Sequence, residues 1–328
     1  MTGTGQREKP VLAIDLGGTK IIAALISRQG EMLAREYSLT HASDGPEAVI
    51  GRLFSAIEHV LDSQRMPSSQ LHSISLAIAG AIDSSNGIVT LSPNLPGWRN
   101  VPLKSIVEEK YGVKTFLLND ANAAALGEHR FGAGKGAKNL IYMTVSTGIG
   151  GGIIINGELY EGASGGAGEI GHMIIDMNGP KCNCGNTGCL EMLASGTAVA
   201  REAIRRLGQG EESALTGMVE GNLENITAEI VGTAAQNGDG LALEVVNQAA
   251  TYLGVGLTNL VNIFNPEVVV IGGGLVKMGD LLLGPARRVV RERAFPLLVR
   301  AVRIVTARLG DDTGVFGAAV FAYQQSVN

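Results

Sequence analysis

The sequence predicts an α/β protein built from two similar halves with a cleft between them. Three observations support this fold class. Strand-like apolar runs alternate with helix-like segments along the 328 residues, which is typical of α/β architecture. A strand–glycine turn–strand pattern occurs twice, at 11–27 and 141–160, and indicates an internal duplication. The chain also exceeds the length of about 250–300 residues at which a single hydrophobic core stops growing.

The first half is expected to open with a β-hairpin. In VLAIDLGGTKIIAALIS an apolar run ends at Asp15, two glycines turn the chain, and a second apolar run begins, as in a hairpin with many buried positions. EMLAREYSLT is expected to add a third strand. Apolar residues at 46–61 recur on one helix face. Strands are expected at 73–83 and 115–120, and the second leads directly into the helix formers of ANAAALGEHR.

The second half is expected to repeat this opening in IYMTVSTGIGGGIIINGELY. LEMLASGTA is expected to be helical. Beyond it we expect helices at 242–264 and 285–295, a strand at 267–274, and a final helix from Val315. The domain boundary is expected near residue 120. One domain then comprises 1–119 with the C-terminal helix at 309–328, and the other comprises 120–308.

Composition and charge argue against several classes of function. Lys and Arg number 26 against 31 Asp and Glu, so there is no basic field to attract nucleic acid or an anionic membrane. The first ten residues, MTGTGQREKP, contain no apolar core of a signal peptide. No apolar run approaches the about 20 residues of a membrane span. We therefore expect a cytoplasmic protein with neither nucleic-acid nor membrane partners.

The glycines gather in turns that could contact phosphate. There are 46 of them, and in DLGGTK and STGIGGG they free backbone N–H groups to face an anion. Asp15 is placed to hold Mg²⁺. One such turn is more simply an ordinary hairpin in which Asp is a turn former. Two turns in corresponding places favour a cleft that grips phosphates from both sides. IGGGL at 271–275 is either a third contact, with adenosine, or a tight strand-to-helix turn.

Asp120 falls where a strand meets a helix in LLNDANAAALGE. One interpretation is a helix N-cap, a position that Asp favours. The other is a general base that accepts the proton of a substrate hydroxyl as it attacks a γ-phosphoryl group. The two roles are compatible, and position in the sequence does not separate them.

All three cysteines follow a histidine with the spacing His172-x9-Cys182-x-Cys184-x4-Cys189. Three thiolates and one imidazole make a closed tetrahedral Zn²⁺ site. A structural site is favoured over a catalytic one because four protein ligands leave no open position. A nucleic-acid zinc knuckle is disfavoured because only Lys181 supplies a basic side chain nearby. Unliganded cysteines are also disfavoured in so polar and glycine-rich a loop.

Two glutamates flank the predicted zinc ligands. Glu169 precedes the histidine by three residues, and Glu191 follows the last cysteine by two. A metal knot between them would fix both carboxylates at one place. Paired carboxylates beside an imidazole suit a polyol, because each can accept hydrogen bonds from hydroxyl groups.

These motifs resemble those of the ROK family of bacterial sugar kinases and sugar-responsive repressors. The likeness extends nearly from end to end and is carried by DLGGTK, SPNLPGW, LNDANAAALGE, STGIGGG, GEIGHM and CNCGNTGCLE. It implies an actin-like, ribonuclease-H-like ATPase fold with two domains and a hinge. It also implies a homodimer, or a larger assembly such as a homotetramer.

The resemblance also implies roles for individual residues. Asp120 would be the catalytic base. His172 would give one ring nitrogen to zinc and the other to the sugar. The residues implied to contact sugar hydroxyls are Asn94, Asn119, Asp120, Glu169, His172 and Glu191. Those implied to bind ATP and its Mg²⁺ are Asp15, Gly17, Gly18, Thr19, Lys20, Thr147, Gly148, Gly272, Gly273 and Gly274.

The function that the resemblance implies is ATP-dependent phosphorylation of the 6-hydroxyl of glucose, because SPNLPGW, Glu191 and the full zinc loop resemble family glucokinases. Kinases of N-acetylglucosamine, N-acetylmannosamine and fructose share nearly all of these residues, and polyphosphate is a possible donor. A repressor is disfavoured because only ten residues precede Val11 and the pI is about 5.6. A catalytically silent sugar sensor is disfavoured because Asp120 is retained in its motif.

Overall fold

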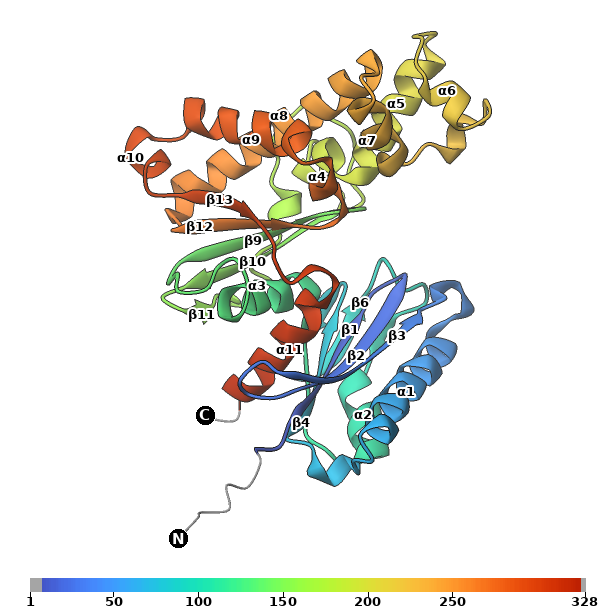
Figure 1. Ribbon diagram of the computed structural model, residues 1–328, viewed down its shortest axis with the longest axis vertical. Helices are drawn as coiled ribbons and strands as arrows, with labels where there is room; N and C mark the ends of the chain where they lie inside the picture. Colours follow the sequence, from blue (N-terminus) through green and yellow to red (C-terminus); the bar gives the residue numbers. More distant parts are fainter. Residues whose placement is uncertain (1–7, 326–328) are drawn as a thin grey trace.

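Two five-stranded sheets with the same strand order dominate the computed structural model, which describes residues 8–325. The sheets lie one above the other, and helices α3 (Asp120–Arg130) and α11 (Thr313–Gln324) lie between them (Figure 1). The remaining helices cover the outer faces of the two sheets. The predicted α/β class is therefore confirmed.

The two sheets share one topology. In each, the first three strands form an antiparallel meander, and two further strands add in parallel beside the first strand. The predicted duplication is thus present in the topology. The first sheet has the order β3 (Met32–Leu39), β2 (Lys20–Ile26), β1 (Val11–Leu16), β4 (Ser73–Ile78), β8 (Thr115–Asn119). The second has the order β11 (Glu158–Leu159), β10 (Ile149–Ile155), β9 (Leu140–Val145), β12 (Val268–Gly272), β13 (Arg303–Thr306).

The helices divide between the two sheets. On the first sheet, α1 (Pro46–Ser63) and α2 (Leu103–Tyr111) cover the outer face. Outside the second sheet lie the helices of the upper half: α4 (Leu190–Ala194), α5 (Gly196–Gly208), α6 (Leu215–Met218), α7 (Ala228–Gln236), α8 (Gly240–Phe264), α9 (Asp280–Arg293) and α10 (Pro296–Val299). Each sheet is thereby buried on both faces, which explains its near-continuous apolar strands.

Alternation along β1 shows how the core positions its first turn. Leu12 and Ile14 point into the cluster beneath α1, whereas Val11 and Ala13 point into the central cluster around α3 and α11, because successive side chains of a strand face opposite ways. All four side chains are fully buried. The strand is therefore held from both faces, and this packing fixes the position of Asp15 near its end.

Helices α3 and α11 approach each other closely enough that only glycine fits at two positions. A Cβ on Gly317 would lie 1.6 Å from the carbonyl oxygen of Ala123, and one on Gly127 would lie 2.5 Å from that of Thr313. Helix α11 also packs on β1 and β4 of the first sheet. These contacts are compatible with a C-terminal helix that belongs with the first half, while the domain boundary at 119/120 stays a prediction.

Two predicted elements are divided in the structure. The strand expected at 73–83 ends at Ile78, because Gly80 adopts a φ of +126° and turns the chain away. Residues 81–83 instead join a separate small sheet of β5 (Ala81–Asp83), β6 (Ile88–Leu91) and β7 (Arg99–Val101). The helical LEMLASGTA is split at Ser195, whose hydroxyl accepts a hydrogen bond from the Ala198 N–H and so caps a second helix.

Helix ends in the C-terminal region also differ from the prediction. The helix expected at 285–295 begins five residues earlier, at Asp280, and contains Pro285. The prediction took Pro285 as the start, although Leu281, Leu282 and Leu283 before it already belong to the helix. The final helix begins at Thr313 rather than Val315. Within residues 8–325 no helix is long and apolar enough to cross a membrane.

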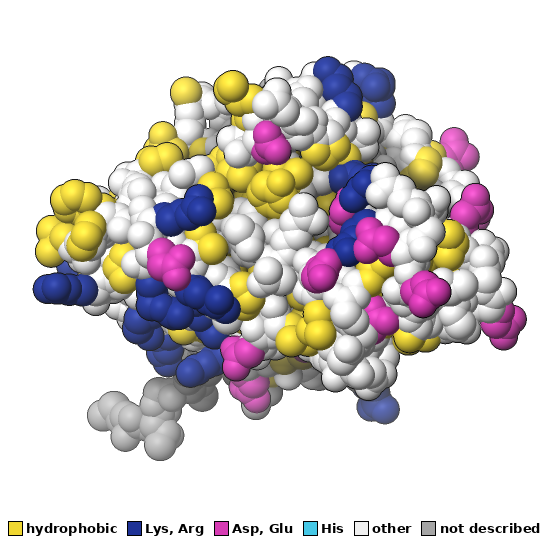
Figure 2. All heavy atoms as spheres, turned by 90° about the horizontal axis from the view of Figure 1, so that it is seen from above, with side chains coloured by type: hydrophobic (Ala, Val, Ile, Leu, Met, Phe, Trp, Pro, Cys, Tyr) yellow, Lys and Arg dark blue, Asp and Glu magenta, His cyan; other side chains and the backbone are white. Residues whose placement is uncertain are grey.

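The outer face of the upper half carries an uneven distribution of charge and exposed apolar groups. Figure 2 shows hydrophobic side chains on this face, with acidic groups mostly towards the side of α5 to α7 and a cluster of basic groups on the opposite side. Ile263, Phe295 and Leu297 are each more than 60% exposed, at 68%, 64% and 69%. The homodimer or homotetramer expected from the sequence stays a prediction.

The contact of α3 with α11 predicts a stability difference between two glycine substitutions. Gly317→Ala should lower the free energy of unfolding by about 1–3 kcal/mol, because its methyl group has to push the helices apart. Gly51→Ala, in α1, is the matched control. Nothing lies within 4 Å of its Cβ position, so alanine should stabilise by about 0.5–1 kcal/mol. Urea unfolding of both variants measures this, and equal effects would contradict the packing.

Candidate active site

The first glycine turn closes tightly at the end of β1. The Gly17 N–H donates to the Lys20 carbonyl at 3.0 Å, and the Thr40 hydroxyl donates to the Gly17 carbonyl at 2.7 Å. A Cβ on Gly18 would lie 2.6 Å from the carbonyl oxygen of Asn94. The predicted phosphate turn and the predicted sugar-binding Asn94 are therefore in backbone contact. The SPNLPGW segment that carries Asn94 is anchored in the core by Leu95 and Trp98.

The second glycine turn is held by the segment that follows the cysteines. The Gly196 N–H donates to the Ser146 carbonyl at 2.7 Å, and the Thr197 hydroxyl donates to the Thr147 carbonyl at 2.8 Å. The Ile149 N–H donates to Glu191 Oε2 at 2.9 Å. A Cβ on Gly148 would lie 2.4 Å from that same carboxylate oxygen. Glu191, predicted to contact sugar, thus also supports the turn predicted to contact phosphate.

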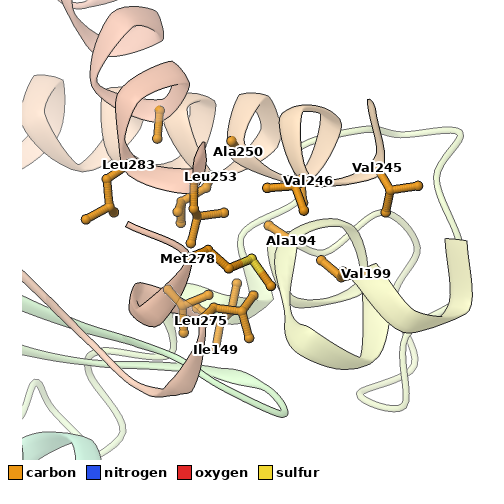
Figure 3. Close-up of a cluster of buried hydrophobic side chains, with 14 of the residues drawn as sticks. Ile149, Ala194, Val199, Val245, Val246, Ala250, Leu253, Leu275, Met278 and Leu283 are labelled. Carbon is orange, nitrogen blue, oxygen red and sulfur yellow. The ribbon is translucent and has the colours of Figure 1, made fainter. Parts of the chain in front are cut away.

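The side chains behind this turn belong to the core of the upper half. Figure 3 shows Ile149, from the turn, in one buried cluster with Leu275 and Met278, which follow the third glycine motif. Ala194 and Val199, from α4 and α5, complete the same cluster. The backbone of both motifs is therefore fixed by apolar packing from behind.

A cavity of about 640 Å³ opens beside the second turn. Ser146 and Thr147 form one wall, and Gly274 another. Of the three glycines predicted near adenosine, only Gly274 lines this cavity. Gly272 packs on the Tyr142 hydroxyl, and Gly273, with a φ of +89°, packs on the Val145 backbone. Sequence reasoning missed the other polar lining residues because they lie in ordinary helices without a motif: Thr197, Thr227, Glu229, Thr233, Gln236 and Lys277.

Asn119, not Asp120, caps helix α3. The Asn119 side chain accepts from the N–H groups of Ala121 at 2.9 Å and Asn122 at 3.1 Å, and it donates to the Gly80 carbonyl at 3.1 Å. Asp120 is the first residue of the helix, and its Oδ1 accepts from the adjacent Ala121 N–H at 2.9 Å. The N-cap interpretation of Asp120 is therefore wrong.

Burial and mutual repulsion shift the protonation of two carboxyl groups in the cleft. Burial raises the pKa of Asp120, and the charge of Glu169 raises it further, although hydrogen bonds to backbone N–H groups of α3 oppose these effects. Burial also raises the pKa of Asp15 to about 7, and the nearby charge of Asp120 adds to this. Two carboxyl groups that affect each other in this way lie close together, at the ends of β1 and β8. Perturbed carboxyl groups of this kind are common at functional sites.

The histidine and the three cysteines converge as the spacing predicted. Their ligand atoms all lie within 4.8 Å of one another. His172 Nδ1 is 3.7 Å from Cys182 Sγ, and Cys184 Sγ is 3.7 Å from Cys189 Sγ. Ligand atoms around a tetrahedral Zn²⁺ are separated by roughly 3.5–3.8 Å, given bond lengths of about 2.0–2.3 Å. The geometry therefore fits a structural zinc site.

The zinc loop brings the predicted sugar ligands to one wall. Cys189 pairs with Ile174 across an isolated β-bridge, and the Leu190 N–H donates to the Met173 carbonyl at 2.8 Å. Glu191 is thereby fixed beside the segment that carries Glu169. His172 Nε2 points away from the cysteines and lies 3.9 Å from Glu169 Oε2. With Nδ1 facing the cysteines, Nε2 thus remains available to a ligand beside Glu169.

The whole described fold is shared with characterised proteins. Residues 11–325 match the model of the ROK family. The chain is 39% identical to a glucokinase of Thermotoga maritima over 94% of this chain and 96% of the relative. It is 36% identical to a xylose repressor of Caldicellulosiruptor bescii over 94% of this chain and 76% of the relative. A structure of a ROK family glucokinase from Streptomyces griseus in complex with glucose and AMPPNP superimposes with a TM-score of 0.82, at 34% identity, over 96% of this chain and 99% of that one.

The chain belongs to the ROK family. The match in sequence covers nearly all of the residues that the structure describes, and the match in structure includes both sheets. The predicted actin-like ATPase fold is therefore confirmed. The comparisons place the chain beside both kinases and repressors, so activity has to be argued from the site.

The converging thiols predict one zinc ion per chain. Burial raises the pKa of the Cys189 thiol to about 12, so that thiol is protonated unless a cation stabilises the thiolate. Elemental analysis of purified protein should find about one Zn²⁺ per chain. Cys184→Ser should lower the melting temperature, because metal binding contributes to folding. Protein that lacks zinc but melts at the same temperature as zinc-loaded protein would contradict a structural role.

The pKa of Asp15 predicts a pH-dependent stability difference for Asp15→Asn. In the folded protein the Asp15 carboxyl group keeps its proton up to about pH 7, whereas its ordinary pKa is 3.8. Between these values the folded state binds more protons than the unfolded state, so this carboxyl group makes stability fall as pH rises. Asparagine does not ionise. The melting temperature of the variant relative to the wild type should therefore increase from about pH 4 to 7 and level off above. A melting-temperature difference that stays constant across this pH range would contradict the raised pKa of Asp15.

Proposed function

We propose that this ROK family protein is an ATP-dependent sugar kinase that phosphorylates the 6-hydroxyl of glucose. The observation that carries the proposal is the position of Asp120. It is half-buried, it starts a helix whose capping is done by Asn119, and charge interactions link it to both Asp15 and Glu169. A base between a phosphate turn and a polyol-binding wall is what transfer to a hydroxyl group requires.

Asp120 would orient the attacking hydroxyl and take its proton late in the transfer. Its raised pKa favours this step, because a more basic carboxylate accepts a proton more readily. The hydroxyl of the sugar is a weak nucleophile and stays protonated at neutral pH. Among the groups that surround it, the glycine-turn amides can donate hydrogen bonds but cannot accept this proton.

The sugar would lie against the wall fixed by the zinc loop. Glu191 Oε2 is already engaged by the Ile149 N–H, which leaves Oε1 to accept from a sugar hydroxyl. His172 Nε2 and Glu169 would contact neighbouring hydroxyls. Asn94 and Asn119 would complete the site from the opposite half. Contacts from both halves explain why the two would close around the sugar and exclude water.

ATP would bind between the two glycine turns, with its adenosine in the cavity beside Thr147 and Gly274. Asp15 and Lys20 face the phosphates from the first turn, and the N–H groups of the second turn face them from the other half. Mg²⁺, held by Asp15, would offset the charge of the phosphates. The proposal of ATP draws support from the AMPPNP that is bound in the related Streptomyces griseus structure.

Glucose is favoured over other sugars by similarity to the glucokinases. The 39% identity to the Thermotoga maritima glucokinase covers nearly the full length of both chains. N-acetylglucosamine, N-acetylmannosamine and fructose kinases are the alternatives, since a few hydrogen bonds separate epimers and N-acetylated sugars. Polyphosphate is an alternative donor. An assay that couples ADP release to a panel of hexoses and N-acetylhexosamines tests the proposal, with glucose expected to give the highest kcat/KM.

A sugar-binding regulator is a second candidate, because xylose repressors match at 36% identity. The position of Asp120 argues for catalysis, since a sensor has no proton to remove. The two functions are separated by the same assay. A protein that binds glucose, measured by calorimetry, yet releases no ADP from MgATP with any sugar would favour the regulator.

The proposed base predicts a specific effect of Asp120→Asn. Asparagine preserves the shape of the side chain but cannot accept the proton, so kcat should fall by about 10²–10⁴-fold. The melting temperature should not fall, because Asn119 keeps the cap and asparagine carries no charge that burial would make costly. Asp280→Asn is the matched control, since Asp280 is likewise the first residue of its helix but is 93% exposed. Equal turnover in both variants would rule out the base.

A further inference from the structure

Glu128, in the last turn of α3, is a fully buried carboxylate outside the site described above. Its Oε1 accepts from the backbone N–H groups of Arg308 and Leu309, both at 2.8 Å. Its Oε2 accepts from the Ala133 N–H at 2.6 Å. A buried charge is costly unless hydrogen bonds compensate it, and charge-assisted bonds of this kind are strong. Three such donors converge on this one side chain.

Two of these bonds, those from Arg308 and Leu309, join the two places where the chain passes between the sheets. Helix α3 leads from β8 of the first sheet to β9 of the second. The segment 307–312 leads from β13 of the second sheet back to α11, which packs on the first. Within residues 8–325 these are the two crossings. Glu128 lies on the first crossing and binds the start of the second.

The second crossing also lies in contact with the first phosphate turn. Two residues beyond Leu309, Asp311 pairs with Lys20, with Nζ and Oδ1 2.5 Å apart. A Cβ on Gly314 would lie 2.5 Å from Asp15 Oδ2, so the start of α11 lies against that carboxylate. The segment that Glu128 anchors therefore contacts Lys20 through Asp311, and the start of α11, which follows it directly, contacts Asp15 through Gly314.

We propose that Glu128 is a positioning residue for the nucleotide phosphates. It holds the 307–312 segment in a fixed position against α3. That segment then positions Lys20 through Asp311, and the start of α11 positions Asp15 through Gly314. The inference rests on the proposed kinase function, because it concerns the phosphate end of that site. Only a carboxylate serves all three bonds, because each of these hydrogen-bond partners is a backbone N–H donor and both oxygens have to accept.

Two kinetic effects are expected of Glu128→Gln. The amide nitrogen of glutamine has to face either the Ala133 N–H or the N–H groups of Arg308 and Leu309, so at least one of the three bonds is lost, and the bonds that remain lose the negative charge of their acceptor. The KM for MgATP should rise on the order of 10-fold, which is what the loss of one hydrogen bond to a charged group corresponds to. The KM for glucose should change little, because the wall fixed by the zinc loop is on the half opposite the first phosphate turn. If Glu128 had a purely structural role, Glu128→Gln would lower the melting temperature. At temperatures below the melting temperature it would leave both KM values unchanged.

Glu267→Gln is the matched control. The Glu267 carboxylate also accepts from a backbone N–H, that of Lys138, at 3.2 and 3.3 Å, but Lys138 belongs neither to the 307–312 segment nor to the first phosphate turn. This variant should keep the KM for MgATP of the wild type. If Glu128→Gln does not fold, Glu128→Asp serves instead, because it keeps both acceptor oxygens but shortens their reach.

A double-mutant cycle with Asp311→Asn tests the route of the effect. Asp311→Asn weakens the contact with Lys20 at the end of the proposed route. If Glu128 acts through this crossing, the two effects on the KM for MgATP should combine to less than their product. Independent effects that multiply fully would overturn the proposal.

Direct binding of Mg-AMPPNP, measured by calorimetry, keeps this test separate from the proposed activity. A wild type that binds Mg-AMPPNP but phosphorylates no sugar would overturn the kinase function and leave the role of Glu128 measurable. Weaker binding by Glu128→Gln than by Glu267→Gln would then support positioning. Equal binding by the two variants would overturn it.

Discussion

The close contact of α3 with α11 is the constraint on which the rest of the molecule depends. Two glycines let the helices touch backbone to backbone, and these helices fill the space between the duplicated sheets. Asp120 starts one helix, and Gly314, against Asp15, lies at the start of the other. The proposed base and the proposed metal ligand therefore take their positions from one helix pair, and the carboxylate of Glu128 fixes the connection at its far end.

The zinc loop has a comparable role for the other wall of the cleft. A loop with so many glycines and so few apolar side chains would not hold one conformation by packing alone. Four ligands around a metal replace that missing core. Glu191 extends the effect, because one carboxylate joins the wall behind the proposed sugar site to the turn behind the proposed phosphate site. The sites for the two substrates are thus parts of one packed unit, which suits a transfer between them.

Burial in the cleft has opposite consequences for stability and for chemistry. It raises the pKa of Asp15 and Asp120 and so makes their ionised forms costly in the free protein. The same burial makes Asp120 a better proton acceptor and would make Asp15 bind a cation more strongly, since Mg²⁺ relieves the repulsion between the two. Such opposition is common where a protein keeps charges for function.

The sequence by itself determined the α/β class, the duplication, the grouping of His172 with the three cysteines and the position of Asp120 where β8 meets α3, because each depends on local spacing or on residue types with few other uses. Only the tertiary structure decided that Asn119 caps α3 rather than Asp120, since adjacent polar residues at a helix start look alike until the backbone is placed. It also decided that Gly80 ends β4, and that Thr227 and Lys277 line the cavity beside Thr147. Glu128 ends the motif LNDANAAALGE, but the motif did not reveal its contacts, because its three donors come from residues five positions and about 180 positions away. A motif records neighbours along the chain, whereas a buried charge is satisfied by whichever backbone groups the fold brings to it.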